Sequence, residues 1–243
     1  MASINFTKHY KRILNIAVPS GLNSLLDIIN IVIGIFMVGR ISSYHIIAVG
    51  LGLNFFMLIY TITNIFFVGT SAQISRLFGK RDFEGITNVL SSMFFGALLL
   101  SIPIYFLANL SYSTYFDWIG TDTTSKILGE IFVCITLYGI PALITKSILI
   151  SAFTSIENTK TPFIIKIITS TTNIALNYVL IFGIIFEPLD IVGIALSNLF
   201  ITYIELVILL ALLARKKTIL KLKLFFDFRI FKKGINIGIP VGI

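Results

Sequence analysis

A polar face runs through the first long apolar stretch of the chain, with a carboxylate at its middle. Its members recur at spacings of 3, 4, 3 and 4 residues and are Ser20, Asn23, Asp27, Asn30 and Gly34. This spacing places them on one side of an α-helix. Amide and carboxylate oxygens are the ligands that hard cations such as Na⁺ prefer, and a buried carboxylate can instead carry a proton. The pattern therefore indicates a site for Na⁺ or H⁺.

Two later apolar stretches carry similar polar faces. The face of the first stretch begins at Lys166 and continues with Ser170, Asn173 and Asn177. The face of the second comprises Asn198, Thr202 and a second carboxylate, Glu205. At about 1.5 Å of helix per residue, Asp27, Asn173 and Asn198 lie at similar depths in their stretches. We therefore predict a cation- or proton-coupling site that consists of Asp27, Asn173, Asn177, Asn198, Thr202 and Glu205. A polar lumen face beside it is predicted to comprise Asn23, Asn30, Gly34 and Ser170.

The same residues also allow structural interpretations. Asn and Thr side chains can hold apolar helices together through hydrogen bonds between helices. A carboxylate inside an apolar helix is costly, which favours a functional role for Asp27 and Glu205. An ion pair with Lys166 or Lys146 would satisfy these acids as well, and the sequence leaves both interpretations open. No cofactor is expected apart from the coupling ion, and no metal beyond Na⁺ at this site.

The composition shows what kind of elements must position these residues. Of 243 residues, 56% are hydrophobic and only 12% are charged, with a mean hydropathy of +0.97. A water-soluble fold of this size has too little volume to enclose so much apolar surface. Crossing the hydrocarbon core takes about 20 apolar residues, and six stretches qualify: 14–38, 47–70, 87–109, 126–153, 163–186 and 191–214. We expect an all-α integral membrane bundle of six transmembrane helices.

The positive charges of the chain are distributed unevenly between the two sides of this bundle. The net charge is +8, and eight Lys and Arg residues lie between Arg215 and Lys233. With the N-terminus inside, almost all basic residues fall in cytoplasmic segments, as the positive-inside rule requires. We therefore expect a multi-pass protein of the plasma (inner) membrane with a cytoplasmic N-terminus. A nucleic-acid partner is not expected, because the charges flank membrane spans and form no basic binding face.

The last residues of the chain resemble its beginning. Residues 10–22 (YKRILNIAVPSGL) and 231–243 (FKKGINIGIPVGI) are identical at five of thirteen positions. Six intervening spans would give both copies the same orientation, as in transporters built from two parallel halves. We expect a six-helix lobe over 1–214, a basic cytoplasmic linker over 215–230 and the truncated start of a second repeat, a seventh helix, over 231–243. Chance similarity between two basic helix starts is the alternative.

Several segments, in order, resemble the multidrug and toxic compound extrusion (MATE) family. They are 69–82 (GTSAQISRLFGKRD), 36–40 (FMVGR) with 47–51 (IAVGL), 159–162 (TKTP) with 173–178 (NIALNY), and 193–198 (GIALSN). The resemblance implies the N-terminal lobe of a two-lobe exporter, with a cation or proton site among spans one, five and six. It assigns Asn173, Asn177 and Asn198 to that site. Many members carry an acid where this chain has Gly34, and Asp27 is the candidate replacement on the same face.

The resemblance implies a Na⁺- or H⁺-coupled antiporter that exports amphipathic organic cations. The chain would then need the missing C-terminal lobe, or a second copy in a homodimer. A lipid-linked oligosaccharide flippase of the same superfamily is an alternative, for which Lys146 and Lys166 are the candidate phosphate ligands. A fragment that does not transport is another. An enzyme is not expected, because nucleophile-elbow, zinc-protease and P-loop motifs are missing from the sequence.

Overall fold

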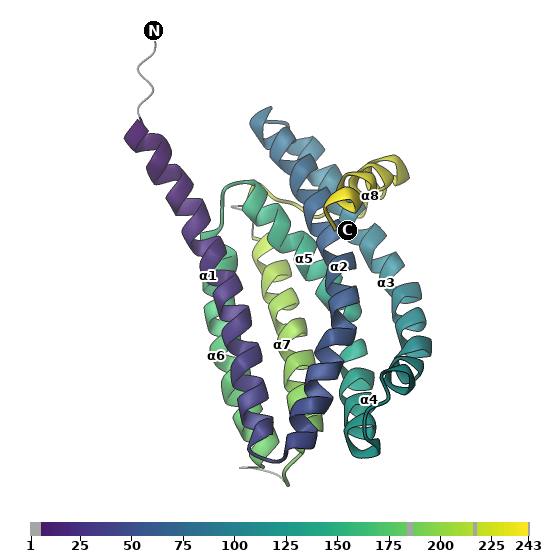
Figure 1. The fold of residues 1–243 in the computed structure, drawn as a ribbon. Coiled ribbons are helices and arrows are strands. Elements are labelled where there is room, and N and C mark those ends of the chain that lie inside the picture. Colours follow the sequence, from purple (N-terminus) through teal and green to yellow (C-terminus); the bar gives the residue numbers. More distant parts are fainter. Residues whose placement is uncertain (1–5, 184–186, 216–217, 243) are drawn as a thin grey trace.

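The computed structural model describes residues 6–183, 187–215 and 218–242, and over these residues it contains α-helices and no β-strand (Figure 1). In chain order the helices are α1 (Phe6–Gly39), α2 (Ser43–Gly79), α3 (Phe83–Ile119), α4 (Thr123–Leu137), α5 (Ile140–Ser155), α6 (Lys160–Phe182), α7 (Asp190–Leu213) and α8 (Phe228–Gly242). The predicted all-α membrane bundle is confirmed.

The number of spans agrees with the prediction when one of them is counted as broken. Five helices are long and apolar enough to cross a membrane, and α4 with α5 makes a sixth that is bent by 54°. The predicted span 126–153 corresponds to this bent pair. Pro141 at the start of α5 explains the bend, because its ring has no N–H and would clash with the carbonyl of Leu137 one turn earlier.

Helix α3 continues beyond the apolar stretch 87–109 and ends at Ile119. The Ser111 hydroxyl donates to the Leu107 carbonyl at 2.7 Å, so this polar residue is satisfied within the helix. The next helix begins where the Asp122 carboxylate accepts the Ser125 N–H at 2.9 Å. This hydrogen bond holds the pKa of Asp122 below its usual value, so the N-cap persists until the pH falls to that lowered pKa.

The helices form a bundle in which α2 is the central element. It contacts α5, α4 and α3 on one side and α1 on the other. The helices α1, α6 and α7 pack together along the opposite edge from α3 (Figure 1). Large fully buried side chains fill the interior, among them Phe66, Phe116, Phe132 and Phe153. Apolar side chains such as Ile28 of α1 point outward, as expected for a surface that faces lipid.

The last helix, α8, packs across α2 and α3 (Figure 1). It begins at Phe228, so it includes the end of the predicted linker 215–230. Ahead of it, the Lys223 and Asp227 N–H groups donate to Ser91 and Ser92 of α3 at 2.9 and 3.0 Å. That α8 opens a second repeat remains a prediction.

The crossing of α2 and α8 depends on Gly69. A Cβ atom at this position would overlap the backbone carbonyl of Gly234, which cannot rotate away as a side chain could. Gly69→Ala is expected to lower the free energy of unfolding by about 1–3 kcal/mol, the usual cost of overpacking. Thermal unfolding followed by circular dichroism in one detergent measures this effect.

Gly50→Ala is the matched control on the same helix, because a Cβ there meets no atom within 4 Å. It is expected to be neutral or slightly stabilising, since Ala favours helix over Gly by about 1 kcal/mol. Equal melting temperatures for the two variants would contradict the close packing of α2 on α8.

Candidate functional site

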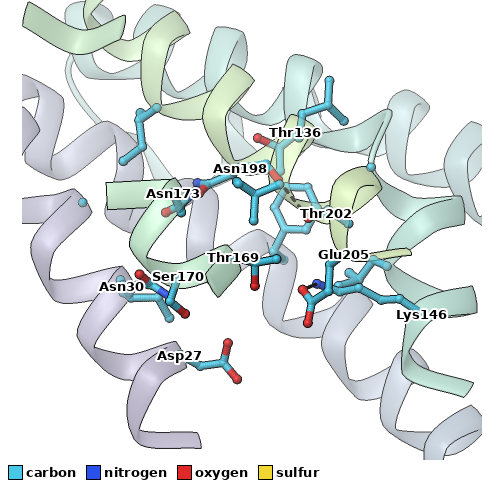
Figure 2. A pocket seen from close by; sticks show the side chains of 18 of the residues that line it. Asp27, Asn30, Thr136, Lys146, Thr169, Ser170, Asn173, Asn198, Thr202 and Glu205 are labelled. Carbon is cyan, nitrogen blue, oxygen red and sulfur yellow. Dashed lines mark hydrogen bonds and ion pairs between the residues drawn. The ribbon is translucent and has the colours of Figure 1, made fainter. Parts of the chain in front are cut away.

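A cavity of about 500 Å³ opens between helices α1, α2, α4, α5, α6 and α7 (Figure 2). Every residue of the predicted site and of the predicted lumen face lines it: Asn23, Asp27, Asn30, Gly34, Ser170, Asn173, Asn177, Asn198, Thr202 and Glu205. Spacing within each helix predicted the faces, and packing brings these faces together. The remaining wall is mostly apolar and aromatic, with Leu53, Phe56, Tyr60, Phe132 and Leu143.

The Asp27 carboxylate of α1 pairs with the Lys166 ammonium group of α6, with 2.5 Å between Oδ1 and Nζ. The two partners differ in surroundings. The Asp27 side chain is 58% exposed, whereas that of Lys166 is 17% exposed. Asp27 is therefore the more exposed partner of this pair.

The Glu205 carboxylate of α7 pairs with Lys146 of α5, with 2.8 Å between Oε2 and Nζ (Figure 2). Here both partners are enclosed, since the Glu205 side chain is 3% exposed and the Lys146 side chain 13%. A charge this deeply buried is stable only beside an opposite charge. Of the interpretations that the sequence left open, ion pairing is the one observed for both acids.

A chain of amides links α6 to α7. The Asn177 amide donates to Asn173 Oδ1 at 3.1 Å, and the Asn173 amide donates to Asn198 Oδ1 at 3.2 Å. One turn earlier on the same face of α6, Ser170 Oγ accepts a hydrogen bond from the Asn30 amide of α1 at 2.7 Å (Figure 2). Hydrogen bonds between helices are thus part of the role of these residues.

Three asparagine side chains that line the cavity have an amide oxygen without a hydrogen-bond partner among the described residues. Asn23 Oδ1, Asn30 Oδ1 and Asn177 Oδ1 are buried and have no hydrogen-bond partner within the described part of the chain. An unpaired buried acceptor is costly, so each such oxygen needs an explanation. These three acceptors are therefore unsatisfied polar groups in the wall of the cavity.

Gly34 contributes space to the site. A Cβ atom at this position would lie 3.0 Å from Ile194 Cδ1 of α7, so the missing side chain allows α1 to approach α7 closely. A side chain at position 34 would require Ile194 to shift.

Sequence reasoning missed several residues that line the cavity. Thr136 and Thr169 contribute hydroxyls, and each hydroxyl donates to a carbonyl of its own helix, at 2.7 and 3.0 Å. A single Thr in an apolar stretch gives no signal, because it satisfies itself locally wherever the helix places it. Lys146 and Lys166, expected either as partners of the acids or as phosphate ligands, both line the cavity.

The charges of the cavity compensate one another. Two carboxylates face two ammonium groups, and amide oxygens lie beside them. The described residues contain no cluster of three His, Cys, Asp or Glu side chains that could hold a metal ion. The arrangement suits binding of a monovalent cation or proton next to an apolar and aromatic wall.

Comparison with known proteins identifies related sequences. The family model MatE matches residues 19–179, which is more than half of the chain. The multidrug export protein MepA of Staphylococcus saprophyticus is 24% identical over 218 residues, which are 89% of this chain and 48% of that protein. The probable multidrug resistance protein NorM of Photorhabdus laumondii is 24% identical and matches 100% of this chain and 54% of its own length. The chain thus spans about half the length of these relatives.

Solved structures show the same fold. A MOP superfamily transporter from Pyrococcus furiosus superposes with a TM-score of 0.88 at 20% identity, over 96% of this chain and 52% of that one. The inward-facing conformation of a multidrug resistance MATE family transporter gives a TM-score of 0.81 at 22% identity, over 95% of this chain and 53% of that one.

Proposed function

The chain belongs to the MatE family of membrane transporters, and we propose that it forms one lobe of a cation-coupled antiporter. This antiporter exports amphipathic organic cations in exchange for Na⁺ or H⁺. The observation that carries the proposal is the convergence of the polar faces of α1, α6 and α7 on one cavity. Asp27, Asn173, Asn177, Asn198, Thr202 and Glu205 are the proposed coupling residues.

The walls of the cavity support an amphipathic substrate. Phe56, Tyr60 and Phe132 offer apolar and aromatic surface, and the volume of about 500 Å³ is in the range of drug-binding pockets. Aromatic faces also attract organic cations. A cation that binds one arrangement of the lobes more tightly than the other would shift the equilibrium between them, and this shift couples the two fluxes.

The membrane in which this lobe lies, its orientation and its partner lobe are also part of the proposal. The distribution of Lys and Arg supports the plasma (inner) membrane, with the N-terminus in the cytoplasm. A second lobe would complete the substrate cavity, supplied either by a C-terminal half or by a second copy of the chain in a homodimer. The coverage of about half of each relative supports this part of the proposal.

A lipid-linked oligosaccharide flippase is less well supported. Its diphosphate group would require free cationic side chains, but Lys146 and Lys166 are each paired with a carboxylate. A chain that does not transport on its own is the other alternative, and reconstitution distinguishes it from an antiporter.

The test of the proposed function is efflux from proteoliposomes that contain the full chain. A fluorescent organic cation such as ethidium is expected to leave the vesicles when a Na⁺ or H⁺ gradient is imposed. It should stay when the gradient is collapsed by an ionophore, or when protein is omitted. Efflux that is the same with and without a gradient would contradict coupling, and no efflux from folded protein would favour the non-transporting alternative.

A further inference from the structure

The two ion pairs of the cavity are built differently. Lys146 and Glu205 are both enclosed, so separating them would leave a carboxylate that water reaches poorly. Lys166 and Asp27 differ in this respect, because the Asp27 side chain is 58% exposed. An ion pair with an exposed partner is held less tightly than an enclosed one. The Lys166–Asp27 pair is therefore the exchangeable one.

Oxygen ligands are already present beside this exchangeable pair. Asn23 and Asn30 lie one turn before and one turn after Asp27 on the same face of α1, and all three line the cavity. Both amides carry a buried Oδ1 without a hydrogen-bond partner among the described residues. A carboxylate flanked by free amide oxygens is a suitable ligand set for Na⁺. The ammonium group of Lys166 already lies on that carboxylate.

We propose that Lys166 is a tethered cation that occupies Asp27 in place of an external Na⁺ and thereby determines which cations this site accepts. The inference rests on the proposed function, in which Asp27 takes the coupling cation. A Na⁺ ion at Asp27 would have to displace the ammonium group. It would also remove the carboxylate to which Lys166 is hydrogen-bonded, while Glu205 stays bonded to Lys146.

The ionisable groups that line the cavity around this pair are Tyr60 of α2, Lys146 of α5, Lys166 of α6 and Glu205 of α7. Within this set, Lys166 is the group within hydrogen-bond distance of Asp27. With Lys166 in place, we infer that Asp27 excludes Na⁺.

Equilibrium binding of ²²Na⁺ to the full chain in lipid nanodiscs tests this inference. The wild-type chain is expected to show no saturable binding at neutral pH. Lys166→Gln removes the competing charge and should create saturable binding, at least about tenfold tighter than any wild-type signal. The double variant Lys166→Gln/Asp27→Asn should lose this binding, because the gained ion needs the carboxylate.

Two controls make the result specific. Lys166→Arg keeps the positive charge and should bind no Na⁺. Lys126→Gln removes a lysine that pairs with Asp117, and neither of these residues lines the cavity. This variant should behave like the wild type. Circular dichroism and size-exclusion chromatography show whether each variant is folded.

Saturable ²²Na⁺ binding by the wild-type chain would overturn the inference, even if Lys166→Gln does not fold. Folded Lys166→Gln that binds no Na⁺ would overturn it too, as would a gain that persists in the double variant. Binding requires neither a gradient nor a second lobe. The binding result can therefore be interpreted even if the chain does not transport. A failure of the proposed function and a failure of the inference about Lys166 are distinguishable.

Discussion

Replacing Lys146 with Met is expected to lower the free energy of unfolding by about 3–5 kcal/mol, which is the usual cost of leaving a buried charge without its partner. The Lys146 ammonium group donates to Glu205 Oε2 at 2.8 Å, and the Glu205 side chain is only 3% exposed. Methionine keeps much of the length of lysine, so the lost charge is the main change. Thermal unfolding of the chain in detergent, followed by circular dichroism at constant pH, measures the effect.

The double variant Lys146→Met/Glu205→Met separates charge from packing. Buried ion pairs replaced by apolar side chains of similar size often retain full stability, so this variant should recover most of the loss. Lys126→Met is the exposed comparison and should change the melting temperature little, because its ion pair with Asp117 is accessible to water. A double variant as unstable as Lys146→Met would mean that packing, and not the unpaired carboxylate, causes the loss.

The faces of the cavity could be predicted from the sequence because helical spacing is a local property. Asp27, Asn173 and Asn198 lie on faces that a spacing of three or four residues defines, and all three line one cavity. Similar depth in the membrane was enough to expect that they meet. The assignment of the amides to α6 and α7 needed no knowledge of the tertiary fold.

The partners of the acids could not be predicted in the same way. Both lysines were recognised as candidates, but which acid each one reaches depends on how the helices are rotated about their axes. The difference between an exposed Asp27 and an enclosed Glu205 also arises from packing, since both residues lie in apolar stretches. Helical spacing alone does not distinguish the Lys166–Asp27 ion pair from the Lys146–Glu205 ion pair.

Two details of the helices lie beyond what hydropathy can predict. Hydropathy averages over many residues, so it finds one span over α4 and α5 and gives no sign of the bend that Pro141 marks. Polar residues after an apolar stretch do not show where α3 ends, because the Ser111 hydroxyl donates to a carbonyl of its own helix.

Replacing Asp27 with Asn is expected to have the largest effect on transport. The variant keeps the size and hydrogen-bonding capacity of the side chain but can neither carry a charge nor take up a proton. Coupling free energies between sites are typically 1–3 kcal/mol, or roughly 5–150-fold, so the gradient-driven part of efflux should fall at least about fivefold. Efflux that needs no gradient should remain.

Asp117→Asn is the matched control for this variant. It makes the same chemical change at an acid that pairs with Lys126 and does not line the cavity. Its gradient-driven efflux should equal that of the wild-type chain. A comparable loss in Asp117→Asn would show that removing any acid, and not specifically Asp27, impairs the reconstituted protein.

The most direct test of the account is therefore gradient-driven efflux of ethidium from proteoliposomes that contain the wild-type, Asp27→Asn or Asp117→Asn chain at equal reconstituted amounts. We predict efflux that follows the imposed gradient in the wild type and in Asp117→Asn, and that no longer follows it in Asp27→Asn. Efflux by Asp27→Asn that still follows the gradient as in the wild type would contradict the assignment of cation coupling to the cavity between α1, α6 and α7.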